Sequence, residues 1–190
     1  MTVRTATASD IADAAGVLAD AYEANPLISW FFPGEPARRK QCVGLFAGLL
    51  TPALRTRLAF VDGDGWGAAV WSPPIEPSGP PRIVRRTDGW NADRRATTLA
   101  AMATARPAVP HFYLAAVGVT PASRRWGLGS ALLQPVLEQC DATGTPAYLE
   151  NSDPVNQLFY EGLGFADVGP ISTGPGGPLL MGMWRPGPIR

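Results

Sequence analysis

Residues 112–130 read Phe-Tyr-Leu-Ala-Ala-Val-Gly-Val, then Thr-Pro-Ala-Ser-Arg-Arg-Trp, then Gly-Leu-Gly-Ser. The first eight residues are apolar throughout, which predicts a strand buried on both faces at the centre of a sheet. The last four open a helix predicted over 127–142, because apolar residues recur there at helical spacing. A buried strand that turns through arginines and glycines into an apolar helix is an ordinary arrangement for binding a pyrophosphate.

The chemistry of this loop rests on its backbone and on four residues. The first amide groups of a helix lack an intrahelical partner, and the helix dipole places positive potential at the same end. Gly127 and Gly129 are expected to let the backbone approach phosphate oxygens without interference from a Cβ atom. Arg124 and Arg125 are expected to add charge-assisted hydrogen bonds to the phosphates.

The glycine spacing taken alone leaves alternatives open. Gly-x-Gly also occurs elsewhere in this glycine-rich chain, so a plain turn before a helix remains possible. A dinucleotide-binding turn would need a third glycine where this chain has Leu132, although Glu150 does stand about 20 residues further on. Seven residues separate Val119 from Gly127, whereas the dinucleotide turn follows its strand directly. The sequence therefore disfavours a dinucleotide site.

The rest of the chain alternates predicted strands and helices, which is the pattern of an α/β sheet. Strands are predicted at 2–5, 58–61, 66–71, 147–150, 165–168 and 179–184, and further helices after a cap at Ser9 and at 36–50, 92–105 and 154–162. Asn25-Pro26 is predicted to end the first helix, and the aromatic stretch 27–33 is predicted to form a loop. The proline-rich segment 72–81 is predicted to be a surface connection.

Composition and length narrow the class of protein. A length of 190 residues suits one domain, and a formal net charge of zero argues against a basic nucleic-acid binder. Cys42 and Cys140 lie in apolar helical patterns and are expected to be small buried side chains in a reducing cytoplasm. The start of the chain lacks the apolar run of a signal peptide, and no apolar run reaches the roughly 18 residues of a membrane span. We expect a cytoplasmic protein with no metal site and no membrane contact.

Several ordered motifs resemble those of one enzyme family. Arg124-Arg-Trp-Gly-Leu-Gly-Ser130 resembles the phosphate loop of the Gcn5-related N-acetyltransferases. The resemblance continues through Tyr148-Leu-Glu150 and through Asn156-x-x-Phe-Tyr-Glu-x-x-Gly-Phe165, so that it covers 110–170 well and 68–73 more weakly. Within the family, the Val-Gly-Val strand, the Gly-Leu-Gly-Ser-Ala run and the mid-helix Pro135 are most similar to the puromycin N-acetyltransferase type.

The resemblance implies a fold and a division of the chain. It implies a mixed, mostly antiparallel central sheet flanked by helices and splayed between the strands 112–119 and 147–150. Residues 1–190 are then a single N-acetyltransferase domain, in which 1–106 mainly serve the acceptor and 110–170 form the acetyl-CoA-binding core.

The resemblance also implies acetyl-CoA as the acyl donor and places its binding residues. The pantetheine arm would pair with the strand 117–119, and Asn156 would reach the cofactor, although a helix cap is the alternative for Asn156. Arg125 and Trp126 stand where the family usually has a glycine and a basic residue, so Trp126 either lies against the adenine or covers the loop. The residues expected at the cofactor are Val117, Gly118, Val119, Arg124, Arg125, Trp126, Gly127, Leu128, Gly129, Ser130, Asn156 and Phe159.

Transfer in this family is direct, from the thioester to a neutral amine, and it needs a base and an acid. Tyr160 matches the general acid of the family, with a core aromatic as the alternative, because a phenol with a pKa of about 10 is protonated at neutral pH. Glu150, at a strand end facing the splay, is the candidate base, because partial burial raises the pKa of a carboxyl. Ordered water is the alternative base. Glu161 is expected to point to solvent and His111 to be structural or exposed.

The acceptor pocket is expected to come from the first half of the chain. Its candidate residues are aromatic and comprise Trp30, Phe31, Phe32 and Trp71. Aromatic walls suit a flat or apolar amine better than a polycationic aminoglycoside. Two functions remain: a small-molecule N-acetyltransferase, monomeric or homodimeric, and a catalytically silent module that binds acyl-CoA on the same fold. The catalytic pair Tyr160 and Glu150 favours the first, because a pure binder needs neither.

Overall fold

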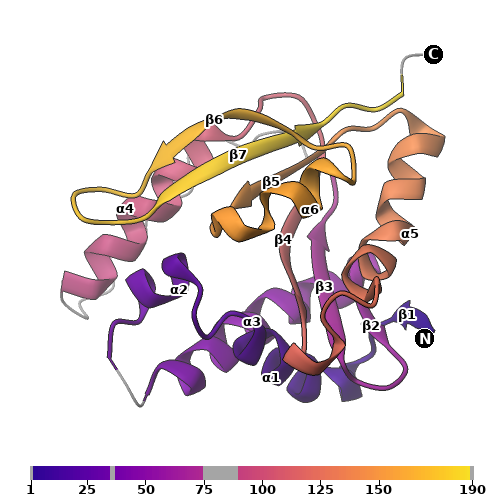
Figure 1. Ribbon diagram of the computed structural model, residues 1–190, viewed down its shortest axis with the longest axis horizontal. Coiled ribbons are helices and arrows are strands. Elements are labelled where there is room, and N and C mark those ends of the chain that lie inside the picture. Colours follow the sequence, from indigo (N-terminus) through magenta and orange to yellow (C-terminus); the bar gives the residue numbers. More distant parts are fainter. Residues whose placement is uncertain (1, 35–36, 75–89, 189–190) are drawn as a thin grey trace.

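The computed structural model describes residues 2–34, 37–74 and 90–188, and for residues 90–92 the backbone only. Within this part of the chain seven strands form one sheet in the order β1-β2-β3-β4-β5-β7-β6 (Figure 1). The strands are β1 (Val3–Thr5), β2 (Ala59–Asp62), β3 (Gly67–Ser72), β4 (Phe112–Val119), β5 (Ala147–Asn151), β6 (Ala166–Ser172) and β7 (Leu179–Arg185). Only β4 and β5 pair in parallel, and the other neighbours pair antiparallel. The predicted mixed, mostly antiparallel sheet is confirmed.

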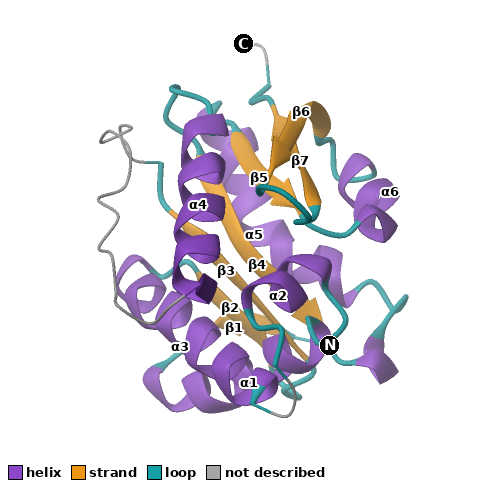
Figure 2. Cartoon of the chain, turned by 90° about the vertical axis from the view of Figure 1, so that its left-hand side faces the viewer, coloured by secondary structure: helices purple, strands orange, loops and turns teal. Residues whose placement is uncertain are grey.

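Helices cover both faces of the sheet. They are α1 (Ile11–Ala21), α2 (Pro26–Phe31), α3 (Arg38–Thr56), α4 (Trp90–Ala105), α5 (Leu128–Thr143) and α6 (Gln157–Glu161), with short 3₁₀ turns η1 (Ala8–Asp10), η2 (Pro121–Ser123) and η3 (Pro154–Asn156). The helices α1 and α3 share one apolar core with β2 and β3, and α5 builds a second core against the other face. Figure 2 shows α4 in front of the strands and α5 behind them.

The sheet opens at its centre. β4 and β5 pair only from Phe112↔Ala147 to Leu114↔Leu149, after which β4 stays with β3 as far as Val119. β5 stays with β7 as far as Asn151, so the two strands part (Figure 1). A β-bulge accompanies the parting, because Trp71 pairs with Leu114 and Val70 with Ala116, which leaves one extra residue in β4. A bulge bends its strand, and the predicted splay is confirmed.

The residues of β4 alternate in burial rather than being buried on both faces as the apolar run predicted. Phe112, Leu114, Ala116 and Gly118 are buried, and the intervening residues are half-buried. The strand does lie fourth of seven, at the centre of the sheet. The half-buried set begins at Tyr113, which still pairs with Tyr148 of β5, so the alternation starts before the two strands part.

Two local predictions near the start of the chain were wrong. Ser9 does not cap the first helix: it lies within η1, where the Asp10 carboxylate accepts hydrogen bonds from the amide and hydroxyl of Thr7. The stretch 27–33 is not a loop, because α2 begins at Pro26. The Asn25 side chain accepts from the amides of Leu27 and Ile28, so the Asn-Pro pair starts a helix as cap and first residue.

The remaining boundaries differ from the predictions by a few residues, except that α3 runs six residues beyond its predicted end at Leu50 and contains Pro52. The free thiols of Cys42 and Cys140 are buried, as predicted. Residues 75–81 of the predicted proline-rich connection lie outside the described residues. Within the described chain, no helix is long and apolar enough to cross a membrane.

Candidate active site

The loop before α5 presents a row of backbone amides. η2 leads through Arg124 to Arg125, and Gly127 then caps α5 with a φ of 80°. The first intrahelical bond joins the Ala131 amide to the Gly127 carbonyl, so the amides of residues 128–130 belong to the unpaired set at a helix start. The first turn is uncharged and Gly127 has no side chain to cap it. These amides are therefore available to an anionic ligand.

The two glycines of the loop differ in their surroundings, and their predicted role in the approach to phosphates remains a prediction. An added Cβ at Gly127 would meet open space, but its positive φ of 80° is one that side chains rarely adopt. An added Cβ at Gly129 would lie 3.3 Å from the ring of Phe159. Gly127 therefore provides a backbone conformation, and Gly129 provides room for α6 to pack against the start of α5. Arg125 adopts a left-handed conformation with a φ of 67°, where a glycine is favoured.

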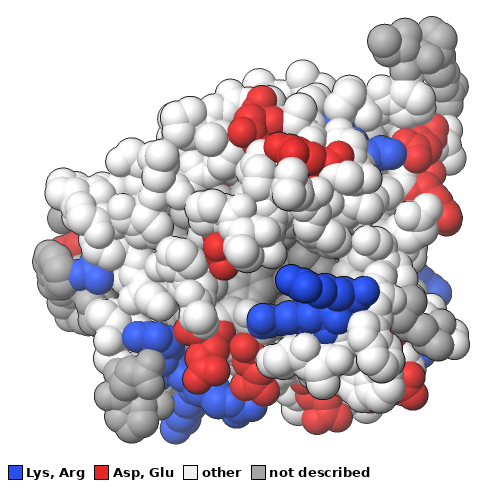
Figure 3. Space-filling model, in the orientation of Figure 1, with Lys and Arg blue, Asp and Glu red and all other residues white. Residues whose placement is uncertain are grey.

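Exposed arginines flank this helix start. Arg124 and Arg125 are exposed, and Trp126 is 71 % exposed. Figure 3 shows Lys and Arg side chains gathered beside a hollow, where Figure 1 draws the turn into α5. Free amides, two guanidinium groups and an uncovered glycine fit a pyrophosphate-bearing ligand such as coenzyme A. For Trp126, contact with an adenine and cover of the loop both remain predictions.

The gap between β4 and β5 is lined by the backbone of β4. The amide of Val117 donates to the hydroxyl of Tyr22, which follows α1, over 3.4 Å. It therefore points away from β3 and into the gap, as the predicted pairing of a pantetheine arm with residues 117–119 requires. The Asn156 side chain makes no capping hydrogen bond at the start of α6, and Asp153 caps η3 instead. Among the described residues the Asn156 amide is thus not used as a cap, and its contact with the cofactor remains a prediction.

Tyr160 lies on α6 beside the same gap. Its ring packs between those of Phe159 and Phe165, and the residue is 8 % exposed. Burial raises the pKa of Tyr160, and the neighbouring Tyr22 and Asp153 raise it further. The phenol is therefore protonated at neutral pH and can donate a proton.

Glu150 is more strongly engaged than the sequence predicted. Its side chain is 2 % exposed and pairs with the guanidinium of Arg106 over 3.1 Å. The same guanidinium lies over the ring of Tyr113, at 3.6 Å from its centre. Burial raises the pKa of Glu150 above its usual value, and the charge of Arg106 and the nearby Tyr113 hydroxyl oppose that rise. The carboxylate is partly desolvated, as a general base requires, but it has a cationic partner.

Three residues of this region were missed by the sequence analysis: Arg106, Tyr113 and Tyr22. Arg106 follows α4 and is 44 positions from Glu150, and Tyr22 is 95 positions from Val117. No local pattern marks either pair, because these contacts depend on how α1 and α4 pack on the sheet. Tyr113 lies in the apolar run that predicted β4, so no separate feature of the sequence assigned it to a site.

The predicted acceptor aromatics are more enclosed than expected. Phe31, Phe32 and Trp71 are buried, Trp71 being only 1 % exposed. Trp30 donates from its indole nitrogen to Thr98 of α4 and lies under the guanidinium of Arg94 at 3.9 Å. Trp30 thus joins α2 to α4 on the Glu150 side of the sheet. Contact of these four residues with an acceptor remains a prediction. Of the four, only Trp30 is not buried, so it is the most accessible to an acceptor.

His111 has a packing environment, which agrees with a structural role. Its ring lies against Tyr148 and Trp184 at centre distances of 5.5 Å and 5.6 Å. Its Nδ1 lies 2.7 Å from the carbonyl of Val109, so this nitrogen carries the proton. Burial lowers the pKa of His111. Glu161 is exposed, as predicted.

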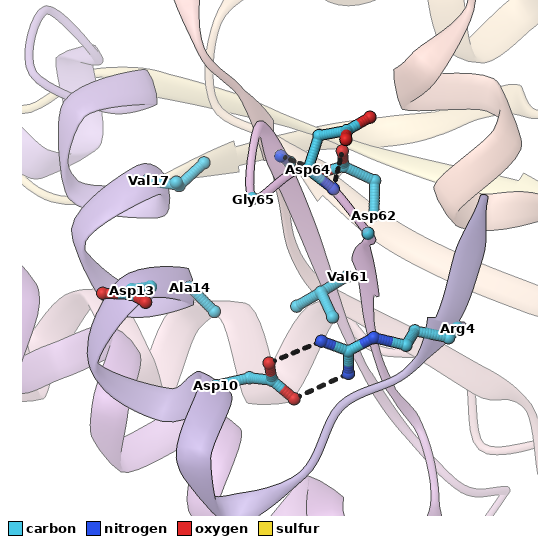
Figure 4. Close-up of a pocket in the computed structure, with 11 residues that line it drawn as sticks. Arg4, Asp10, Asp13, Ala14, Val17, Val61, Asp62, Asp64 and Gly65 are labelled. Atoms are coloured by element: carbon cyan, nitrogen blue, oxygen red, sulfur yellow. Dashed lines mark hydrogen bonds and ion pairs between the residues drawn. The ribbon is translucent and has the colours of Figure 1, made fainter. Parts of the chain in front are cut away.

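A recess of about 240 Å³ lies away from this gap, between α1 and the β2–β3 turn (Figure 4). Arg4 and Asp10 close one side of it with two hydrogen bonds. The Asp62 carboxylate accepts from the amides of Trp66 and Gly67 and holds the turn. Among the described residues, no group of three or more metal-ligating side chains could hold an ion. The recess is explained by turn and cap geometry.

Comparison with known proteins supplies the family. Residues 70–165, just over half of the chain, match the sequence model described as the acetyltransferase (GNAT) family. This chain belongs to that family. The match spans β4, the arginine loop, α5, β5 and α6, and members of this family are acetyltransferases.

Solved structures of GNAT proteins share the whole fold. The histone acetyltransferase HPA2 and related acetyltransferase of Corynebacterium glutamicum is 25 % identical, with a TM-score of 0.71 over 100 % of this chain and 97 % of that one. An agmatine N-acetyltransferase is 20 % identical, with a TM-score of 0.72 over 96 % and 97 %. The polyamine N-acetyltransferase of Drosophila melanogaster is 19 % identical, with a TM-score of 0.71 over 97 % and 99 %.

Proposed function

We propose that this GNAT protein transfers an acetyl group from acetyl-CoA directly to the primary amine of a small molecule. The observation that carries the proposal is the parting of β4 and β5 after Leu114, beside an uncapped helix start with two exposed arginines. One end of the gap suits a pyrophosphate, and the buried carboxylate of Glu150 lies at the other strand. A single 1–190 domain, with the donor core in 110–170, follows from this arrangement.

The donor side of the proposal divides the work among three groups of residues. Arg124, Arg125 and the amides of residues 128–130 hold the phosphates by charge-assisted hydrogen bonds. The backbone of 117–119 pairs with the amides of the pantetheine arm, as an added strand would. Asn156 and Phe159 complete the wall on the α6 side.

In the proposed chemistry, Glu150 accepts a proton from the ammonium group of the acceptor. Tyr160 then donates its phenolic proton to the leaving sulfur. A raised pKa brings the Glu150 carboxylate closer to the proton affinity that a base needs at neutral pH. Arg106 pairs with this carboxyl group in the resting protein over 3.1 Å and must share it when an ammonium approaches. The amine then attacks the carbonyl carbon, the carbon–sulfur bond breaks, and the proton that the nitrogen loses after the attack returns through solvent to the Tyr160 phenolate.

The acceptor is proposed to carry one amine on an apolar or aromatic body. The α4 side of the sheet carries Arg94, Arg95 and Arg106, and the first two lie over the rings of Trp30 and Phe32. The guanidinium of Arg106 beside the Glu150 carboxylate disfavours an acceptor with several positive charges.

The motif likeness to the puromycin type makes puromycin, an amine with an aromatic body, a candidate acceptor. The competing function is a silent module that binds acyl-CoA without turning it over.

We further propose that the protein is cytoplasmic, because the free thiols of Cys42 and Cys140 suit a reducing compartment. We propose that it acts as a monomer or homodimer, with no nucleic-acid or membrane partner.

A thiol-release assay tests the proposal. Free coenzyme A is measured with acetyl-CoA and a panel of phenylethylamines, puromycin, agmatine and spermidine, and with no acceptor as the blank. We expect release with one or more monoamines and a lower kcat/KM for spermidine. Binding of acetyl-CoA without release for any acceptor supports the silent module, and absence of acetyl-CoA binding in a thermal-shift titration rejects both functions. NAD serves as the negative ligand.

A further inference from the structure

Tyr22 has a hydroxyl group placed in the gap between β4 and β5. The residue follows α1, and its ring packs against Phe46 of α3, with ring centres 5.1 Å apart. Its hydroxyl accepts the amide proton of Val117 over 3.4 Å. α1 lies against the face of β4 opposite to α5, since a Cβ at Gly118 would meet Ala21 and Leu18. The phenol thus reaches around the edge that β5 leaves open.

The hydroxyl proton of Tyr22 remains available. A phenolic oxygen both donates and accepts, and here it accepts from Val117. Within the described residues, no acceptor for the Tyr22 proton is found. A hydroxyl that accepts one hydrogen bond becomes a better donor in a second one, because the two bonds polarise each other in a low-dielectric site.

A second phenol adjoins this group. The proximity of Tyr22 raises the pKa of Tyr160, which comes from α6 on the other side of the gap. Burial raises the pKa of Tyr22 as well. Both hydroxyl groups are therefore protonated at neutral pH, and that of Tyr22 is held in the gap by its contact with Val117.

We propose that the Tyr22 hydroxyl donates a hydrogen bond to the thioester carbonyl oxygen of the bound acyl donor, which makes Tyr22 a further catalytic residue. The inference rests on the proposed function and divides its chemistry between two phenols. Tyr160 gives a proton to the leaving sulfur, whereas Tyr22 keeps its proton and stabilises the negative charge that develops on oxygen as the amine attacks. The ring contact with Phe46 fixes the donor in advance, which is what makes such a contact effective.

The decisive variant is Tyr22→Phe, which keeps the ring on Phe46 and removes one oxygen atom. Titration calorimetry with acetyl-CoA and with coenzyme A separates the carbonyl contact from all other contacts. We expect affinity for acetyl-CoA to fall about fivefold relative to coenzyme A, the size of one neutral hydrogen bond. With an acceptor, kcat is expected to fall about 10²- to 10³-fold, as for the loss of one oxyanion donor. Tyr160→Phe, by contrast, is expected to leave the affinity ratio unchanged.

A spectroscopic measurement needs no acceptor. The carbonyl carbon of [1-¹³C]acetyl-CoA is expected to move downfield on binding to the parent protein and to move less with Tyr22→Phe, because a hydrogen bond polarises the carbonyl. Tyr148→Phe is the matched control: the Tyr148 hydroxyl is buried without a hydrogen-bond partner among the described residues. That variant is expected to reproduce the parent in both measurements.

The outcomes separate the inference from the function on which it rests. An unchanged affinity ratio and an unchanged carbon shift in Tyr22→Phe overturn the inference, while acceptor-dependent release of coenzyme A by the parent upholds the function. Parallel loss of both affinities also overturns it, since Tyr22 would then only support the shape of the gap. If the parent binds neither acetyl-CoA nor coenzyme A, the proposed function fails and this inference fails with it.

Discussion

Arg125→Gly is expected to strengthen the fold and weaken the site. Arg125 has a φ of 67°, a left-handed conformation that costs a side-chain-bearing residue about 1–2 kcal/mol. Glycine relieves this cost but loses more conformational freedom on folding, by roughly 0.5–1 kcal/mol. The net gain in the free energy of unfolding is therefore about 0.5 kcal/mol. For a chain of this length that corresponds to a rise in Tm of roughly 1–2 °C.

The same change removes a guanidinium from the loop. A hydrogen bond to a charged group contributes about 1.5–3 kcal/mol, so the Kd for acetyl-CoA is expected to rise roughly 10- to 100-fold. Arg125→Ala is the matched control, because it loses the charge and keeps the unfavourable φ, and we expect it to bind as weakly but to melt below the glycine variant. A thioester of N-acetylcysteamine, which has no phosphates, should be turned over equally by all three proteins.

Differential scanning calorimetry and titration calorimetry measure the two effects separately. Two results would refute the reasoning. A glycine variant that melts several degrees below the alanine variant would mean that the left-handed conformation carries no cost. An unchanged Kd for acetyl-CoA in both variants would mean that Arg125 does not contact the phosphates, and Arg124 and the amides would carry the charge contacts alone.

Three further predictions concern the other parts of the site. Glu150→Gln is expected to slow transfer at neutral pH and to remove the acid limb of the pH profile of kcat/KM. In the parent this limb should lie above pH 4.5, because the pKa of Glu150 is raised and the base works only when deprotonated. An unchanged profile would assign the role of base to water. Tyr160→Phe should lower kcat by about 10² to 10⁴ with Tm and acetyl-CoA affinity preserved, whereas turnover within about threefold of the parent would make Tyr160 a core aromatic. Gly127→Ala should lower the free energy of unfolding by about 1 kcal/mol, because the residue has a φ of 80°. Gly129→Val should instead weaken acetyl-CoA binding by pushing Phe159 away. Equal effects of the two variants on Tm and on acetyl-CoA affinity, measured by calorimetry, would contradict these separate roles.

The pairing of Glu150 with Arg106 has a consequence for catalysis. The Glu150 side chain is 2 % exposed and lies 3.1 Å from its cationic partner Arg106. An acceptor ammonium can bind the same carboxylate beside Arg106 more easily than it can displace Arg106. Displacing the guanidinium fully would leave a charge with reduced solvation, which is costly. We therefore expect an acceptor amine to approach beside Arg106 and to transfer its proton to a Glu150 carboxylate oxygen.

The order of strand, arginine loop and helix in 112–130 already predicted the β4–α5 unit and the membership of the GNAT family. These features are local: each follows from neighbouring residues through apolar periodicity, the unpaired amides of a helix start and the conformation that Gly127 allows. The splay was anticipated only through the family resemblance. The helix α2 could also have been predicted, because Asn25-Pro26 is a start signal as well as a stop signal.

Other features were decided by the tertiary structure. The partners of Glu150 and of Val117 stand 44 and 95 positions away in the chain, and no spacing rule relates them. The burial of Phe31, Phe32 and Trp71 depends likewise on which helix covers which face, and the room for Phe159 at Gly129 depends on how α6 meets α5. Local propensity fixes where helices and strands begin. Which side chains then meet is set by the packing of whole elements around the apolar cores, because burial free energy depends on contact area and not on sequence distance.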